Sequence, residues 1–316
     1  MRPAILALAG PELAPAEAAL FRAMPPAGVI LFGRNIVDPP QLAALVRALR
    51  AVLPEGAVLM VDQEGGRVAR LGPPHWPAQP AAGRLGTLHA ARPPAGRRAA
   101  WLSGALIGRE CRAAGFDVVA APVADLAVPG AHAVVGDRAF AAEPGRVAAL
   151  AGAFAAGLLA AGVQPVVKHA PGHGRARADS HAELPVVTAP ADLLDADLEP
   201  FRALRHLPWM MTAHVCYDAW DRCRPATLSA VVIGEVIRRR IGFAHLLVSD
   251  DLAMGALSGR PGERARAALA AGCDLVLFCA GDVAANAAVL AACPAMAADV
   301  AAKLRRAAAF AAGAAG

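Results

Sequence analysis

The segment from Lys168 to His181 (KHAPGHGRARADSH) contains side chains suited to acid–base catalysis. It begins with Lys168 and His169 and ends with Asp179 and His181, and glycine and proline interrupt the chain between them. The i, i+2 spacing of Asp179 and His181 would direct both side chains the same way in an extended segment. Asp179 could then accept a hydrogen bond from one ring nitrogen of His181, which leaves the other nitrogen to give and take a proton near neutral pH.

The same histidines allow two simpler interpretations. Imidazole and carboxylate are common metal ligands, so His169, His173, Asp179 and His181 could form a metal site. Glycine and proline separate these residues, however, and their spacing is unlike the compact His-Glu-x-x-His arrangement of helical zinc sites. The histidines could also do no more than order a loop. We expect neither a metal ion nor an organic cofactor.

The run LLVSDDLAM at residues 246–254 places an acidic pair directly after a hydrophobic strand pattern. Asp250 stands where a rigid strand could aim a carboxylate at a substrate carbon, and such a nucleophile is usual in glycosidases. Asp251 could instead cap a following helix. The pair is also compatible with substrate-assisted chemistry, in which an acetamido oxygen of the substrate replaces the protein nucleophile.

The motif VDQEGGRVARL at residues 61–71 could bind a ligand rich in hydroxyl groups. Asp62 leaves a buried strand pattern, Gly65–Gly66 permits a tight turn, and Arg67 and Arg70 follow. A carboxylate can accept from two neighbouring sugar hydroxyls while an arginine donates to another oxygen. The alternative is that Asp62 caps the next helix and pairs with Arg70.

Two weaker signals also follow predicted strands. Arg138, in VVGDRAF at residues 134–140, could bind a hydroxyl or a carboxylate, or it could lie on the surface. His214, in MTAH at residues 211–214, could take part in chemistry at a strand end or be a buried histidine with satisfied hydrogen bonds. The sequence does not decide between these roles.

Alternating strand and helix patterns must position these groups. Short β-branched or leucine-rich runs are separated by helical patterns such as Gln41–Leu53, Trp101–Ala114 and Arg146–Ala161, which predicts a parallel sheet with helical crossovers. Strands are expected at Ile5–Ala9, Val29–Phe32, Val58–Val61, Val118–Ala121, Pro165–Lys168, Trp209–Thr212, Leu246–Ser249 and Asp274–Phe278. Their number and the chain length fit one (β/α)8 TIM barrel over residues 1–316, and an open doubly wound sheet is the alternative.

A barrel would bring the polar strand ends together, because TIM-barrel sites are built at the carboxyl ends of the strands. Asp62, Lys168–His169, His214 and Asp250 each end or follow a predicted strand. We therefore expect these residues on one rim.

Two segments contain no predicted strand. The Pro/Gly-rich stretch Leu71–Gly96 is predicted to be a long excursion over one barrel face. The alanine-rich stretch Ala284–Gly316 predicts closing helices and a frayed end.

The composition argues against nucleic-acid and membrane partners. The net charge is +5, but the arginines are dispersed, and one tyrosine leaves little aromatic surface for stacking bases. The apolar runs are broken well short of the roughly 20 residues that span a bilayer, and the apolar run Pro3–Gly10 is too short for a signal peptide. Six scattered cysteines without a CxxC pair predict reduced, mostly buried thiols, so we expect a cytoplasmic location.

The motifs taken together resemble those of family 3 glycoside hydrolases, in particular their single-domain bacterial β-N-acetylglucosaminidases. The segments that carry the resemblance are GVILFGRNI at 28–36, VDQEGGRVARL at 61–71, VVGDRAF at 134–140, KHAPGHGRARADSHAELPVV at 168–187 and SDDLAM at 249–254. The resemblance covers nearly the whole chain and implies a TIM barrel. It also implies a retaining exo-hydrolase that removes N-acetylglucosamine from GlcNAc–anhydro-N-acetylmuramyl peptides during cell-wall recycling.

The resemblance also implies a role for each candidate residue. Asp250 would be the nucleophile of a covalent glycosyl-enzyme, His181 the acid/base, and Asp179 its partner, an exception to the usual pair of carboxylates. A histidine on a mobile loop would reach the leaving oxygen when the loop closes. The residues around the N-acetylglucosamine would be Asp62, Arg70, Arg138, Lys168 and His169. The expected partner is this small muropeptide, and the expected state is a monomer.

Two departures from the family pattern leave other functions open. Ala170 stands where the family often has an aromatic residue, and the loop Arg175–Ala178 is more basic than expected. A basic loop and a neutralisable histidine could admit phosphate as the acceptor, so a β-N-acetylglucosaminide phosphorylase is one alternative. A non-catalytic muropeptide- or sugar-binding protein is another, although pure binding needs neither a nucleophile nor an acid.

Overall fold

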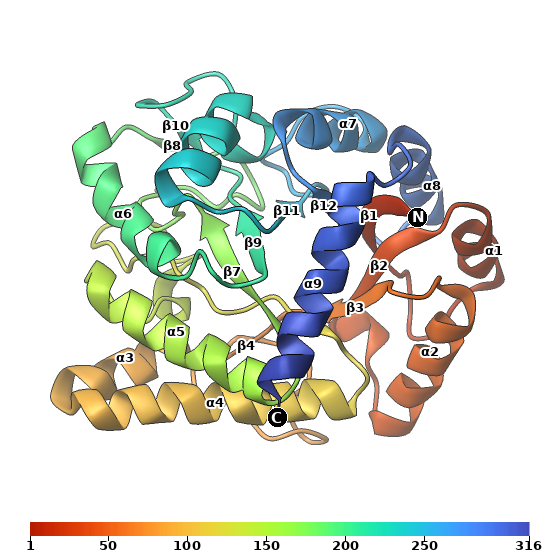
Figure 1. Ribbon diagram of the computed structural model, residues 1–316, viewed down its shortest axis with the longest axis horizontal. Coiled ribbons are helices and arrows are strands. Elements are labelled where there is room, and N and C mark those ends of the chain that lie inside the picture. Colours follow the sequence, from red (N-terminus) through yellow and green to blue (C-terminus); the bar gives the residue numbers. More distant parts are fainter. Residues whose placement is uncertain (316) are drawn as a thin grey trace.

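A closed barrel of eight parallel strands forms the centre of the computed structural model, which describes residues 1–315 (Figure 1). Around the barrel the strands follow the order β1-β12-β11-β9-β7-β6-β3-β2, and each pairs in parallel with its neighbours. Their bounds are β1 (Arg2–Ala7), β2 (Pro26–Leu31), β3 (Val58–Val61), β6 (Val118–Val119), β7 (Gln164–Ala170), β9 (Trp209–Thr212), β11 (Leu246–Asp251) and β12 (Leu275–Phe278). The predicted TIM barrel is confirmed, and the open doubly wound sheet is wrong because β1 pairs with β12 and closes the ring.

The helices surround this barrel and begin where the sequence favours a helix start. Proline occupies the first turn of several of them, where its missing N–H costs no hydrogen bond. Asp38 caps the second helix by accepting from the Gln41 backbone N–H at 2.8 Å. The helices are α1 (Pro15–Ala23), α2 (Pro39–Val52), α4 (Pro93–Ala113), α5 (Pro144–Ala160), α6 (Ala191–Ala203), a π-helix η4 (Val232–Ile241), α7 (Pro261–Ala271), α8 (Val283–Ala292) and α9 (Ala298–Ala314).

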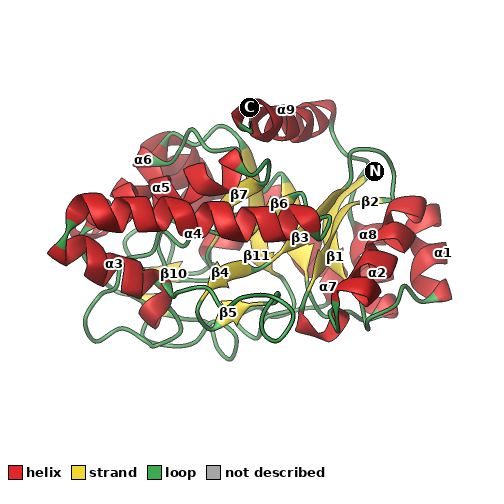
Figure 2. Cartoon of the chain, turned by 90° about the horizontal axis from the view of Figure 1, so that it is seen from below, coloured by secondary structure: helices red, strands yellow, loops and turns green. Residues whose placement is uncertain are grey.

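Strand alternation divides the core into two layers. In β1, Ile5 belongs to the cluster inside the barrel, whereas Leu6 belongs to the cluster between the strands and the outer helices. The inner layer continues into α9, whose Val300, Leu304 and Ala307 pack against the barrel interior. Helix α9 therefore lies across the amino-terminal end of the barrel, on the side away from the loops that follow the strands (Figure 2).

The stretch Leu71–Gly96 contains both irregular chain and helix. It does leave the barrel as an irregular segment, but residues Ala82–Ala91 form helix α3, and α4 has already begun at Pro93. Four of the six prolines of this stretch lie before Ala82, and α3 itself contains no proline, although Gly83 and Gly86 fall within it. The closing helices predicted in Ala284–Gly316 are α8 and α9, and Gly316 itself lies outside the described residues.

Small elements complete the loops at the carboxyl end of the barrel. A hairpin follows β3 directly, and a two-stranded ladder joins the segment after the histidine loop to the segment after β9. These elements are β4 (Gln63–Gly65), β5 (Val68–Ala69), β8 (Val186–Val187) and β10 (Cys216–Tyr217), with 3-10 turns η1 (Gly33–Asn35), η2 (Gly136–Arg138) and η3 (Ala226–Leu228).

The cysteines agree with the sequence-based expectation. All six are free thiols, and Cys223 alone is exposed. Over residues 1–315, the helices are too short or too polar to cross a bilayer.

Candidate active site

A cavity of about 520 Å³ lies at the carboxyl ends of the barrel strands. It is lined by all the candidate catalytic and substrate-binding residues of the sequence analysis: Asp62, Arg70, Arg138, Lys168, His169, Asp179, His181 and Asp250. These residues come from the ends of β3, β7 and β11, from the residue that follows the β4–β5 hairpin, from the turn η2 and from the histidine loop. The expectation that polar strand ends converge on one rim is met, except at His214.

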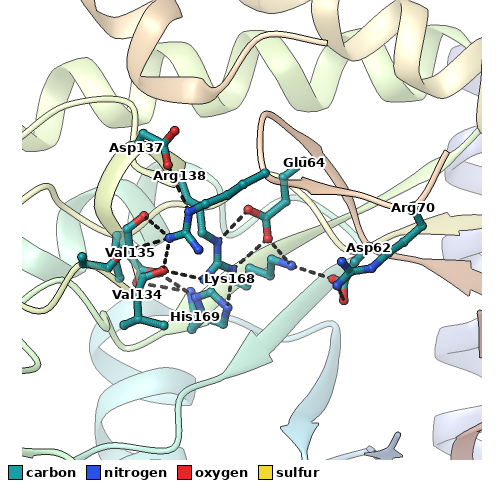
Figure 3. A network of polar contacts seen from close by, with 12 residues as sticks. Asp62, Glu64, Arg70, Val134, Val135, Asp137, Arg138, Lys168 and His169 are labelled. Carbon is teal, nitrogen blue, oxygen red and sulfur yellow. Dashed lines mark hydrogen bonds and ion pairs between the residues drawn. The ribbon is translucent and has the colours of Figure 1, made fainter. Parts of the chain in front are cut away.

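A buried cluster of charges forms one wall of the cavity, and Figure 3 shows its members pointing toward one another. The Lys168 ammonium lies 2.8 Å from Asp62 Oδ1 and 2.7 Å from Glu64 Oε1, and its side chain is only 3% exposed. Arg138 donates to both oxygens of Glu64 at 2.8 Å, and Arg70 reaches Asp62 Oδ2 at 3.4 Å. The geometry is that of paired, charge-assisted hydrogen bonds.

Pairing keeps both carboxylates of this cluster ionised. Burial by itself would raise the pKa of Glu64, but the charges of Lys168 and Arg138 outweigh it and lower that pKa to about 2. Burial would also raise the pKa of Asp62, but the charges of Lys168 and Arg70 lower that pKa overall. The wall therefore presents fixed anions and cations at neutral pH, which suits a polar ligand with many hydroxyl groups.

The first turn after Asp62 decides between the two interpretations of that residue. No helix follows it; the chain enters the β4–β5 hairpin, in which Gly65 and Gly66 have φ angles of 95° and 58°. The predicted helix cap is therefore wrong and the predicted tight turn is confirmed. The ion pair with Arg70 that accompanied the cap interpretation is present.

His169 owes its orientation to a carboxylate that lies outside the predicted set. Asp125 is completely buried and accepts from His169 Nδ1 at 2.7 Å. Burial would raise the pKa of Asp125, but the charge of His169 and its hydrogen bond lower that pKa overall. The Asp125 carboxylate is therefore ionised and accepts the hydrogen bond, so His169 Nδ1 carries the hydrogen. The other nitrogen, Nε2, lies 3.4 Å from Arg138 Nη2.

The acid–base pair of the histidine loop is present, but in a different local geometry from the predicted one. Asp179 Oδ1 lies 2.7 Å from His181 Nδ1 and accepts from the His181 backbone N–H at 2.9 Å. The chain is not extended here: the N–H groups of Ala182 and Glu183 donate to the Asp179 carbonyl and close a turn. Asp179 therefore reaches the ring by the local turn that aspartate favours.

The exposure of this pair agrees with a role toward solvent and ligand. The His181 side chain is 64% exposed and that of Asp179 36%. Slight burial acts against ionisation of Asp179, but the hydrogen bonds from His181 prevail and lower its pKa. An ionised Asp179 can stabilise the positive charge that His181 acquires when it takes up a proton.

Asp250 lies at the end of β11 with its carboxylate toward the cavity. Its Oδ1 accepts from the Asp251 backbone N–H at 2.8 Å, and its own N–H donates to Thr212 Oγ1 at 3.3 Å. Burial would raise the pKa of Asp250, yet the nearby imidazoles of His214 and His169 lower it overall. A half-buried, ionised carboxylate on a rigid strand end is the arrangement that a nucleophile needs.

Asp251 has a different role from its neighbour. Its Oδ1 accepts from the backbone N–H groups of Ala253 and Cys279, each at 2.8 Å, so it ties the end of β11 to the residue after β12. The predicted helix cap is wrong, because a turn and not a helix follows. Burial raises the pKa of Asp251.

His214 is a buried histidine with satisfied hydrogen bonds, not a rim residue. Its Nε2 lies 2.9 Å from the Asp251 carbonyl oxygen and its Nδ1 lies 2.8 Å from Thr227 Oγ1. Because a carbonyl only accepts, Nε2 carries the hydrogen, and burial lowers the pKa of the ring. Thr227 in turn lies 2.7 Å from Thr212, so the ring supports the backbone on both sides of Asp250.

Sequence reasoning missed Glu64 and Asp125. Glu64 lies in the DQEGG motif beside Asp62, and this adjacency was the signal that could have found it. Asp125 is the one polar residue between Val118 and Val128, in a run that follows a strand. The metal-site interpretation gains nothing, since residues 1–315 contain no group of three or more His, Cys, Asp or Glu side chains that could hold a metal ion.

Comparison with known proteins agrees with this geometry. The family model described as "Glycosyl hydrolase family 3 N terminal domain" matches residues 11–309. A β-hexosaminidase of Alkalilimnicola ehrlichii is 43% identical over 282 residues, 88% of this chain and 80% of that protein. A β-hexosaminidase of Bordetella pertussis is 40% identical over 287 residues, 89% of this chain and 81% of that protein.

The solved structures give the same result. NagZ from Neisseria gonorrhoeae, in complex with N-trifluoroacetyl-D-glucosamine, superposes with a TM-score of 0.84 at 33% identity and covers 100% of this chain and 98% of its own. A family 3 β-N-acetylglucosaminidase from a Paenibacillus species also gives a TM-score of 0.84 at 31% identity, over 99% of this chain and 60% of its own.

Proposed function

Because this chain belongs to glycosyl hydrolase family 3 and is a β-N-acetylhexosaminidase, we propose that it removes terminal β-linked N-acetylglucosamine from peptidoglycan fragments through a covalent intermediate on Asp250. One observation carries the proposal: an ionised carboxylate on a strand end and a histidine–aspartate pair on a loop line the same cavity. A cavity with these two groups can supply a nucleophile and a proton to one glycosidic bond.

The chemistry proceeds in two displacements. Asp250 attacks the anomeric carbon while His181, charged and paired with Asp179, gives its proton to the leaving oxygen, so the glycosidic bond breaks as the glycosyl ester forms. The now neutral His181 takes a proton from water, which attacks the same carbon and releases Asp250. Two inversions at one carbon give net retention.

The charged wall of the cavity holds the sugar in this proposal. Carboxylate oxygens of Asp62 accept from ring hydroxyls, and Arg70, Lys168 and Arg138 donate to sugar oxygens. His169 adds a ring nitrogen that is fixed in orientation by Asp125. The N-acyl sugar bound to the similar Neisseria protein supports N-acetylglucosamine as the residue in the cavity.

We assign the natural substrate to the GlcNAc–anhydro-N-acetylmuramyl peptides of cell-wall recycling, and the enzyme to the cytoplasm. The five buried free thiols agree with a reducing compartment. All the candidate site residues come from one chain, so a monomer with one barrel, residues 1–316, suffices as the catalytic unit.

The role of His181 is tested by the dependence of rate on the leaving group. For His181→Ala we expect kcat/KM to fall about 10²–10⁴-fold on the poorly leaving phenyl N-acetyl-β-D-glucosaminide but less than about tenfold on the 4-nitrophenyl glycoside. The reason is that 4-nitrophenolate leaves without a proton. Asp179→Asn should show the same trend in weaker form. Equal losses on both substrates would remove His181 from the role of acid.

Phosphorolysis has weaker support, because the first arginine of the basic loop is already engaged. Arg175 donates to both oxygens of Asp197, at 2.7 and 3.0 Å, so its charge is paired inside the protein. We expect free N-acetylglucosamine as the main product in phosphate buffer and in sulfate of equal ionic strength alike. If N-acetylglucosamine 1-phosphate dominates in phosphate, simple hydrolysis is wrong.

A further inference from the structure

We propose that His173 is a positioning residue, which holds the loop of the acid/base through a hydrogen bond to Ser180 and so keeps His181 where it can reach the leaving oxygen. The inference rests on the role proposed for His181. It concerns a residue that does not belong to the substrate-binding or acid–base set and that links the rigid barrel to the loop.

The barrel fixes one side of this link. The backbone N–H of His173 donates to Asp125 Oδ1 at 2.7 Å, and Asp125 holds His169 through its other oxygen. The His173 ring packs edge-on against the His169 ring, with centroids 5.9 Å apart, and is buried. One carboxylate inside the protein therefore orients both the sugar-binding end of β7 and the start of the histidine loop.

The other side of the link lies between the two members of the acid–base pair. His173 Nε2 lies 3.0 Å from Ser180 Oγ, and Ser180 is buried although both of its neighbours face the solvent. Because Asp179 and His181 project outward, their positions depend on the backbone that carries them. Ser180 is the point at which that backbone is attached to the interior.

A second attachment comes from the opposite side of the loop. The N–H groups of Gly255 and Ala256 donate to the carbonyls of His181 and Ser180, at 3.1 and 3.2 Å. A Cβ at Gly255 would come within 2.7 Å of the His181 oxygen, so glycine is needed for this approach. The backbone of the loop is therefore held at Gly255–Ala256, and the side chain of Ser180 is held at His173.

The polarity of His173 argues for this role over simple packing. Its Nδ1 is buried without a hydrogen-bond partner among residues 1–315. An unsatisfied buried nitrogen destabilises the folded protein, and a phenyl ring of similar size would avoid this loss. Burial lowers the pKa of His173 to about 4, in a site where the charged neighbours are Asp125, His169 and Asp250. The ring is therefore neutral at working pH, and its bond to Ser180 persists while His181 gains and loses its proton.

The test compares Ser180→Ala, His173→Phe and the double variant with wild type and His181→Ala on phenyl and 4-nitrophenyl N-acetyl-β-D-glucosaminides. Each single variant should lose about 10–100-fold in kcat/KM on the phenyl glycoside and less than about threefold on the 4-nitrophenyl glycoside. The double variant should be no worse than the worse single one, because both remove the same bond. Ser103→Ala, at a buried serine of α4 outside the cavity, is the matched control and should leave both rates unchanged.

The outcomes separate the two proposals. If His181→Ala loses the same factor on both glycosides, the role of His181 is wrong and the inference falls with it. If His181→Ala depends on the leaving group but Ser180→Ala loses nothing, or loses equally on both glycosides, the inference alone is wrong. Additive losses in the double variant also overturn it. Should His173→Phe fail to fold, Ser180→Ala decides the question by itself.

Discussion

Replacing Asp250 by alanine is expected to lower kcat/KM on 4-nitrophenyl N-acetyl-β-D-glucosaminide by on the order of 10⁴-fold or more, because the covalent route loses its nucleophile. The loss should be equal for good and poor leaving groups, since bond formation at the anomeric carbon fails in every case. The rate of 4-nitrophenol release measures it directly. Asp299→Ala, on α9 at the far end of the barrel, is the control and should retain full activity.

Trapping the intermediate separates this mechanism from substrate-assisted chemistry. An activated 5-fluoro analogue of N-acetylglucosamine should add one glycosyl unit to the wild-type protein, and peptide mapping should place it on Asp250. Asp250→Ala should gain no mass. If Asp250→Ala keeps its rate and the wild type forms no adduct, the acetamido oxygen of the substrate is the nucleophile and the covalent proposal is wrong.

Glu64→Ala is expected to lower the free energy of unfolding by about 3–5 kcal/mol, because it leaves buried cations without their shared partner. Glu64 accepts from Arg138 with both oxygens and from Lys168 at 2.7 Å, and its own side chain is only 6% exposed. Both cations would turn toward Asp62 or the cavity, so KM should rise as well. Urea unfolding and steady-state kinetics measure the two effects.

The matched control for this prediction is a surface pair. Glu143 lies 3.4 Å from Arg146 and is 61% exposed, so Glu143→Ala should change stability by less than about 0.5 kcal/mol. If Glu64→Ala is as mild as Glu143→Ala, the charged wall does not depend on this carboxylate.

The acid dependence of stability gives a second readout for Glu64. Its pKa lies at about 2 in the folded protein, against an ordinary value of 4.5. A depressed pKa contributes stability that is complete above pH 4.5 and is lost as the pH falls toward 2. The stability difference between wild type and Glu64→Gln should therefore shrink across that window, and a constant difference would contradict the ion pairing.

Much of the barrel could be predicted from the sequence because buried strands carry a strong local signal. All eight predicted strands overlap strands of the barrel, since short β-branched runs between helical patterns are typical of buried parallel strands. Helix α3 was not predicted, because it lies in a Pro/Gly-rich stretch and itself contains Gly83 and Gly86.

Some residues of the site could be predicted from the sequence and others could not. Residues at strand ends could be placed on one rim because barrel topology alone brings those ends together. Which carboxylates pair with Lys168 and His169 was not predicted, because the pairs Lys168–Glu64 and His169–Asp125 join segments far apart in the chain. The burial of His214 could not be predicted either, because its hydrogen-bond partners are Thr227 and the Asp251 carbonyl of β11.

The position of α9 has a consequence for the order in which the protein is made. The ring of strands cannot close before β12 is available to pair with β1, and the interior remains open at its amino-terminal end until Val300, Leu304 and Ala307 arrive. Both events wait for these late residues to leave the ribosome. The nascent chain therefore exposes the barrel interior, including the large ring of Trp209, until α9 has been synthesised, and exposed apolar surface of this kind favours aggregation.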